Sequence, residues 1–98
     1  MTDAAARMVE VLRAARELVA RPGNDFSWSS WADAAAALAE LDGLIAKLEH
    51  DGTCEELTLE VIFAATGPFQ ELSMSSGIAD EFLALADRYD AAAAALFG

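Results

Sequence analysis

Two runs of apolar residues, spaced alternately three and four apart, constrain the fold of this chain more than any other feature. The first run comprises Trp31, Ala34, Leu38, Leu41, Ile45 and Leu48, and the second comprises Ile78, Phe82, Leu85, Tyr89, Ala92 and Leu96. This spacing places the members of each run on one face of an α-helix, which another part of the protein must cover. The two runs therefore predict two long helices, at about 29–49 and 77–96.

A third long helix is expected near the N-terminus, at about 3–20. Its apolar residues fall on one helical face and are Met8, Val11, Leu12, Ala15, Leu18 and Val19. Pro22 and Gly23 end this helix, because the residue before a proline avoids helical geometry. Gly52 similarly marks the end of the second helix.

The start of the second helix has two interpretations, which the sequence leaves open. Ser30 and Asp33 have the spacing of a capping box, with Asp in place of the usual Glu. Alternatively, Ser27 is the N-cap, and Phe26 and Trp31 form a hydrophobic staple around it. The last helix would take Ser75 or Ser76 as its N-cap.

Residues 53–76 are the ambiguous part of the chain. Thr53 to Glu56 resembles a capping box, and Leu57, Val61 and Ala64 or Ala65 would share one face of a helix. The segment 57–63 also alternates like a strand and could form a hairpin with 69–74. We favour short helices, because the cap is strong and the partner strand is weak. Pro68 is expected to begin a helical turn that runs through Ser73.

These elements predict an all-α fold: a small antiparallel bundle of three long helices (about 3–20, 29–49 and 77–96) with shorter helical elements in 53–76. Ninety-eight residues form one domain, 1–98, since chains divide only at greater length. Twenty-three of the residues are Ala, which buries little surface, so the core is thin and a homodimer would help to cover it.

The charge of the chain excludes two classes of partner. Seventeen acidic and six basic side chains give a net charge of −11, which opposes binding to nucleic acid and to anionic membrane surfaces. Residues 1–21 carry a net charge of +1 and residues 25–98 carry −12, so the two parts should attract each other, within one chain or between two.

The composition also indicates a compartment. Cys54 is alone and has no disulfide partner in the chain, the N-terminal residues lack the pattern of a signal peptide, and the longest apolar run has seven residues. We therefore expect a cytoplasmic protein. Five Arg against one Lys, together with abundant Ala, suggest a bacterial source.

Catalytic motifs are not evident in the sequence. His50 is the only histidine, and nothing in its spacing selects Ser27, Ser29, Ser30 or Cys54 as its partner. A metal cluster of His50, Asp51, Cys54, Glu55 and Glu56 can be drawn, but helix ends explain these residues better. We expect no catalytic residues, no metal, no cofactor and no enzymatic activity.

Two groups of residues are candidates for binding. Phe26, Trp28 and Trp31, together with Tyr89, could form a lid over the core, a protein interface or a small-molecule pocket, and the sequence does not decide among the three. Asp80, Glu81, Asp87 and Asp90 avoid the apolar positions of the last helix and could face a basic protein partner. The function expected from the sequence is a non-enzymatic protein–protein interaction module that acts as a homodimer. The alternative is a small-molecule-binding protein with an aromatic pocket.

Overall fold

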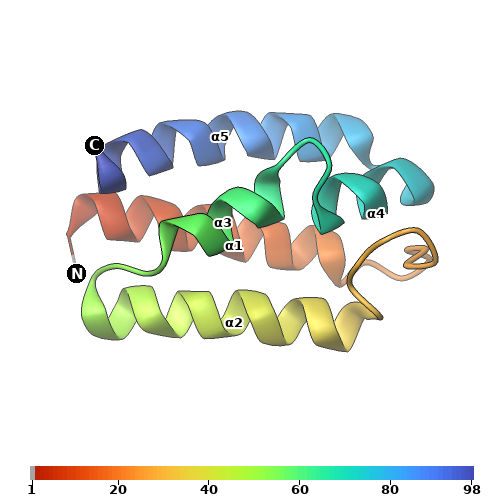
Figure 1. The fold of residues 1–98 in the computed structure, drawn as a ribbon, viewed down its shortest axis with the longest axis horizontal. Helices are drawn as coiled ribbons and strands as arrows, with labels where there is room; N and C mark the ends of the chain where they lie inside the picture. The colour runs from red at the N-terminus through yellow and green to blue at the C-terminus, as the bar shows by residue number, and fades with distance from the viewer. Residues whose placement is uncertain (1) are drawn as a thin grey trace.

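The computed structural model describes residues 2–98, and within this range it contains helices and no strands (Figure 1). The helices are α1 (Asp3–Val19), α2 (Ala34–Asp51), α3 (Glu56–Phe63), α4 (Pro68–Ser76) and α5 (Ala79–Phe97). The all-α prediction is therefore confirmed, with three long helices and two short ones between residues 53 and 76.

The chain forms an up-and-down helical bundle, in which the segment between α2 and α5 is divided into the two short helices α3 and α4 (Figure 1). Helix α1 packs against α2 on one side and against α5 on the other, and it is antiparallel to both. Helices α3 and α4 follow one another along the bundle, in front of α1, and both contact α5. The expected antiparallel arrangement is thus only approximate, because α2 and α5 run in the same direction.

The central position of α1 explains its composition. A helix with neighbours on two sides needs a wide apolar face, and α1 buries all six of the residues predicted to be apolar contacts, together with Ala5 and Val9. Its N-cap is Thr2, whose hydroxyl accepts a hydrogen bond from the backbone N–H of Ala5 at 3.2 Å.

Helix α2 begins later than the sequence pattern predicted. Its N-cap is Asp33, whose carboxylate accepts the N–H of Ala36 at 2.8 Å, so both Ser27 and Ser30 were wrong as N-caps. Trp31 lies outside the helix but is still buried, which is why it extended the apolar run. Gly52 ends α2 in the left-handed conformation, at φ 77°, as expected.

Residues 56–63 form a helix, which excludes the alternative hairpin. The capping box was wrong, because the N-cap of α3 is Glu55 and its side chain makes no capping hydrogen bond. The apolar face that predicted the helix was wrong as well: Leu57 and Val61 are 67% and 53% exposed. Helix α3 instead buries Leu59, Ile62 and Phe63.

Gly67 and Pro68 separate α3 from α4. Pro68 is the first residue of α4, as expected, and the helix extends past Ser73 to Ser76. Ser75 and Ser76 therefore lie inside α4 and do not cap α5, whose N-cap position is Ile78. The apolar run predicted for the last helix is buried from Ile78 to Ala92, at its members Ile78, Phe82, Leu85, Tyr89 and Ala92, and Leu96 is half-buried.

Two arginines of α1, and a third just after its end, are paired with acidic residues of the neighbouring helices. Arg13 binds Glu49 at 3.0 Å and Arg16 binds Asp42 at 2.6 Å, both on α2. At the other side of α1, Arg21 binds Glu81 of α5 at 2.8 Å. The attraction expected between the two parts of the sequence therefore operates within one chain.

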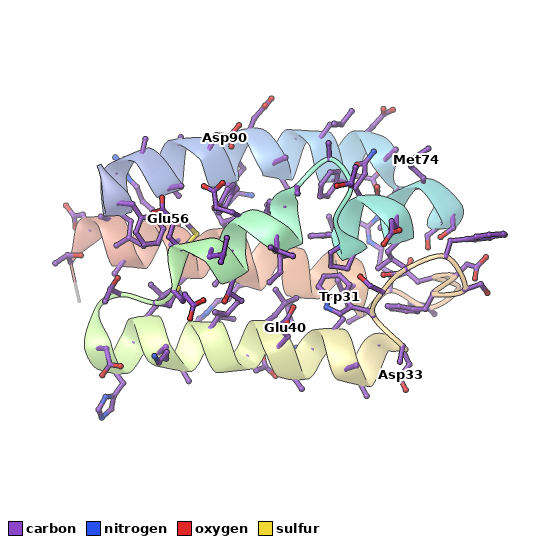
Figure 2. The ribbon with its side chains drawn as sticks, viewed as in Figure 1. Trp31, Asp33, Glu40, Glu56, Met74 and Asp90 are labelled. Carbon is purple, nitrogen blue, oxygen red and sulfur yellow. The ribbon has the colours of Figure 1, made fainter. Side chains whose placement is uncertain are left out.

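An aromatic cluster joins α3, α4, α5 and the loop before α2. Phe69 of α4 is fully buried, and its ring centroid lies 5.7 Å from that of Trp31, 5.9 Å from that of Phe63 and 4.9 Å from that of Phe82. Trp31 also donates its indole N–H to Glu40 of α2 at 3.2 Å, and Figure 2 shows both residues at the inner side of α2. Phe69 and Trp31 thus fix the loop and α4 to the bundle.

Candidate binding cleft between α4 and the 24–32 loop

The loop that joins α1 to α2 is fastened to α4 by serine hydroxyls. The backbone N–H of Asp25 donates to the hydroxyl of Ser76 at 2.9 Å, and the hydroxyl of Ser75 donates to the carbonyl of Asp25 at 2.7 Å. The loop therefore uses both its donor and its acceptor at Asp25 to pair with the last turn of α4.

Further along, the loop is attached to the first turn of α4. The hydroxyl of Ser29 donates to the carbonyl of Pro68 at 2.8 Å, and the N–H of Ser30 donates to the carboxylate of Glu71 at 3.3 Å. Of the three serines between the aromatic residues, Ser29 holds the loop in place through its side chain and Ser30 does so through its backbone N–H. The segment from Asp25 to Ser30 is consequently anchored at both ends.

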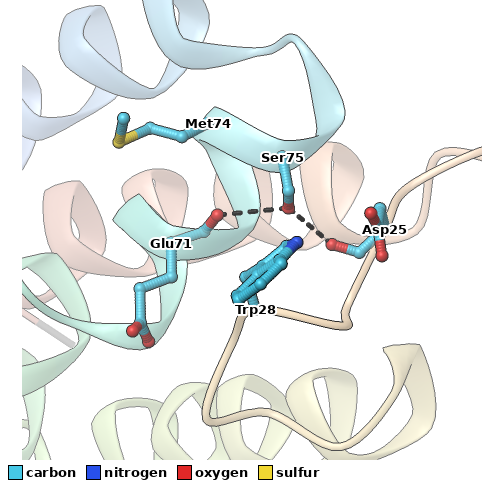
Figure 3. A pocket seen from close by; sticks show the side chains of 5 residues that line it. All are labelled: Asp25, Trp28, Glu71, Met74 and Ser75. Atoms are coloured by element: carbon cyan, nitrogen blue, oxygen red, sulfur yellow. Dashed lines mark hydrogen bonds between the residues drawn. The ribbon is translucent and has the colours of Figure 1, made fainter.

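Between these anchors, Trp28 projects from the protein and forms one wall of a cleft. The cleft has a volume of about 490 Å³ and is lined by Asp25, Trp28, Glu71, Met74 and Ser75. Figure 3 shows the indole between the side chains of Asp25 and Glu71, with Met74 further along the same side of α4. Trp28 and Met74 are 73% and 69% exposed, the highest values among the large apolar residues described as exposed.

The cleft carries two negative charges. Hydrogen bonds from the side chain and backbone of Ser27 lower the pKa of Asp25, so this carboxylate is ionised at neutral pH. Within residues 2–98, neither Asp25 nor Glu71 forms a salt bridge. An exposed aromatic face beside unpaired carboxylates is suited to binding a cation.

The structure separates the four aromatic candidates. Trp31 and Tyr89 belong to the core, where they are 6% and 4% exposed, and Phe26 is half-buried against it. Tyr89 stacks on Phe63, with ring centroids 4.3 Å apart, and does not reach the cleft. Trp28 alone lines the cleft, so three aromatic residues have structural positions and one is free to bind.

The acidic candidates on α5 are also divided. Asp80, Asp87 and Asp90 are exposed on this helix, and Leu83 between them is 56% exposed. Glu81 is instead paired with Arg21, which follows the end of α1. A basic partner at this face would therefore meet three aspartates rather than four carboxylates.

The cleft residues Asp25, Glu71, Met74 and Ser75 were missed in the sequence. Met74 offered one signal, because it lies outside the apolar face of α4 that buries Phe69 and Leu72. The closeness of Asp25 and Ser75, which are fifty residues apart in the chain, had no local signal.

Potential catalytic groups are not brought together. Ser27, Ser29 and Ser30 precede the first turn of α2 and His50 lies in its last, a separation of roughly 25 Å at 1.5 Å per residue. His50 is exposed and its ring nitrogen lies 2.9 Å from Asp51, whereas Cys54 is buried. Within residues 2–98, no group of three His, Cys, Asp or Glu side chains is arranged to hold a metal ion.

Comparisons with models of protein families, with curated proteins and with solved structures give no match. Within the described residues, no helix has the length and apolarity needed to cross a membrane. What the cleft binds is therefore inferred from its own residues.

Proposed function

We propose that this protein is a non-enzymatic interaction module that binds a basic partner protein in the cytoplasm through the cleft between α4 and the 24–32 loop. The observation that carries the proposal is the exposure of Trp28, at 73%, on a loop that hydrogen bonds fasten to α4 at both ends.

The energetics of protein interfaces support this use of Trp28. Tryptophan is enriched among the few residues that supply most of the binding energy, and a side chain already held in place loses little conformational entropy on binding. Met74 adds an adaptable apolar surface beside it. The acidic surface of the chain, at a net charge of −11, would accelerate the approach of a basic partner.

A second copy of the chain is the second candidate partner. Leu57 and Val61 are exposed one turn apart on α3, beside a groove that also includes Glu40, Glu55 and Ile62. A homodimer through this face would bury the two aliphatic side chains. It would also bring together acidic surfaces that repel each other, which favours the basic partner over the homodimer.

Site-specific cross-linking distinguishes these partners. A benzophenone amino acid would replace Met74, Leu57 or Leu83 in turn, since each is exposed on a different part of the surface and Met74 lines the cleft while Trp28 is left in place. The same group at Ala46, exposed on the outside of α2, is the control. After irradiation in the native cells, we expect an adduct with a basic protein from position 74 and none from position 46.

Each other result has a defined meaning. An adduct of twice the chain mass from position 57 would identify the homodimer, and an adduct from position 83 would identify the α5 face. A small-molecule-binding protein, the remaining alternative, would give no protein adduct at any position. In each of these cases the proposed use of the cleft is wrong.

A further inference from the structure

We infer that the cleft binds the guanidinium group of an arginine side chain from the partner protein, stacked on the indole of Trp28 and attracted by the carboxylates of Asp25 and Glu71 (Figure 3). This inference rests on the proposed function and names the chemical group that the cleft recognises.

The indole provides the surface for the guanidinium. Tryptophan is the aromatic side chain that attracts cations best, and the planar guanidinium can both stack on the ring and keep its N–H groups free to donate in the plane. Trp28 is open to such stacking, because the loop hydrogen bonds leave its side chain 73% exposed.

The carboxylates on either side of the indole complete the recognition. Backbone N–H groups of the loop fix both of them: Ser27 donates to Asp25 at 2.9 Å and Ser30 donates to Glu71 at 3.3 Å. Each carboxylate is therefore already oriented, and a guanidinium stacked on the indole can donate to the carboxylate on its side of the ring while the other adds to the negative potential (Figure 3). Met74 offers an apolar contact for the methylene stem of the same arginine.

The chain itself does not supply this cation. Three of its arginines bind acidic residues of other helices, and none of the cleft residues is basic. Lys47 and His50 lie near the far end of α2 from the loop, and Arg7 and Arg88 line a groove between α1 and α5. The cation must therefore come from another molecule.

Titration with matched peptides tests the inference. The probes are the pentapeptide acetyl-Gly-Gly-Arg-Gly-Gly-amide, the same peptide with citrulline, which is a neutral isostere of arginine, and the same peptide with norleucine. The readout is the indole N–H signal of Trp28 in ¹⁵N–¹H correlation spectra, which W28F assigns, since the chain has two tryptophans.

We expect the arginine peptide to shift the Trp28 signal and to bind at least about tenfold more tightly than the citrulline peptide. The double variant D25N/E71Q keeps the acceptor oxygens that fasten the loop and removes both charges, so it should lose most of this preference. The control D87N/D90N removes two charges from α5 and should retain it.

The possible failures are distinguishable. Equal binding of the arginine, citrulline and norleucine peptides would overturn the cation site and leave a cleft that binds apolar side chains, as the proposed function allows. Equal weakening by D25N/E71Q and D87N/D90N would show that the general acidic field attracts arginine. No shift with any peptide would also overturn the inference, whereas the cross-linking from position 74 tests the proposed function independently.

Discussion

At the scale of single residues, Gly67 has the strictest steric requirement in the junction between α3 and α4. Its φ of −85° suits any residue, but a Cβ at this position would collide with the carbonyl oxygen of Val61 and press on those of Ile62 and Ala64. Space, rather than backbone conformation, therefore selects glycine at this position.

We predict that Gly67→Ala lowers the free energy of unfolding by about 2–3 kcal/mol, in the range of overpacking mutations. The matched control is Gly43→Ala, because Gly43 is exposed within α2 and a Cβ there would meet nothing within 4 Å. This control should gain about 1 kcal/mol from helix propensity. Urea denaturation measures both, and equal effects of the two substitutions would contradict the steric argument.

Tyr89 is a second residue whose surroundings have a measurable consequence. Its hydroxyl is buried with no hydrogen-bond partner among the described residues, and burial, followed by the negative charges of Glu60, Glu56 and Asp90, raises its pKa to about 12. The folded protein therefore holds the phenol proton more tightly than the unfolded chain, in which the pKa is about 10.

It follows that Tyr89 contributes stability that is complete below about pH 10 and is lost as the pH rises to about 12. Since Tyr89 is the only tyrosine, tyrosinate absorbance near 295 nm reports this residue alone. We predict a titration well above pH 10 in the folded protein. Tyr89→Phe removes the ionisable hydroxyl, so the free energy of unfolding of the variant should fall less than that of wild type between about pH 10 and about pH 12. Identical dependence on pH in the two proteins would contradict this prediction.

At the scale of helices, capping is where the sequence pattern and the structure disagree most. Helices and their buried faces follow from apolar spacing, which α1, α2 and α5 satisfy over many turns, so those three helices were predictable. An N-cap depends on one hydrogen bond, and several Ser, Thr and Asp residues near each start could have made it. The hydroxyls of Ser29, Ser75 and Ser76 bind other segments instead, which no local pattern reveals.

The cap of α2 gives a direct test. We predict that Asp33→Ala lowers the free energy of unfolding by about 1 kcal/mol, because it leaves the N–H of Ala36 without its acceptor. Asp33→Asn should retain most of the stability, since its amide oxygen can still accept the bond. Thr53→Ala should have little effect, because Thr53 does not cap α3. Chemical denaturation of the three variants compares them, and a large loss at Thr53 would restore the capping box.

The candidate cleft was less predictable than the helices. Trp28 could be singled out because tryptophan is rarely left exposed, but the same reasoning applied to Trp31, which is buried. The difference between them is tertiary: the indole of Trp31 packs on Phe69, which lies 38 positions after it, and donates to Glu40 of α2. Leu57 and Val61 also show that local spacing does not decide burial. They are one turn apart on α3, as buried residues would be, but the helix buries Leu59, Ile62 and Phe63 instead.

At the scale of the whole molecule, the negative charges greatly outnumber the positive ones, and the arginine ion pairs are gathered around α1. The net charge of −11 repels itself across a molecule with extents of 36 × 23 × 20 Å. The ion pairs between α1 and its neighbours are exposed, and exposed pairs add little stability. Added salt should therefore weaken the repulsion among the acidic side chains more than it weakens the attraction within the ion pairs.

We predict that the melting temperature rises as salt increases from about 0.01 M to about 0.15 M, where the Debye length falls from about 30 Å to about 8 Å. D87N/D90N reduces the net negative charge without changing an ion pair. This variant should melt at a higher temperature than wild type in low salt, and its melting temperature should change less when salt is added. Differential scanning calorimetry measures both. A melting temperature that falls with salt would show that the ion pairs of α1 matter more than the overall repulsion.

The central position of α1 also sets the order in which the protein can fold. Helices α1 and α2 are neighbours in the sequence and can pair as soon as residue 51 has been made, because few residues separate them. The opposite side of α1 stays uncovered until α5, which ends at residue 97, is complete. During synthesis α1 therefore waits for α5, and its exposed apolar side is the surface that a chaperone would meet.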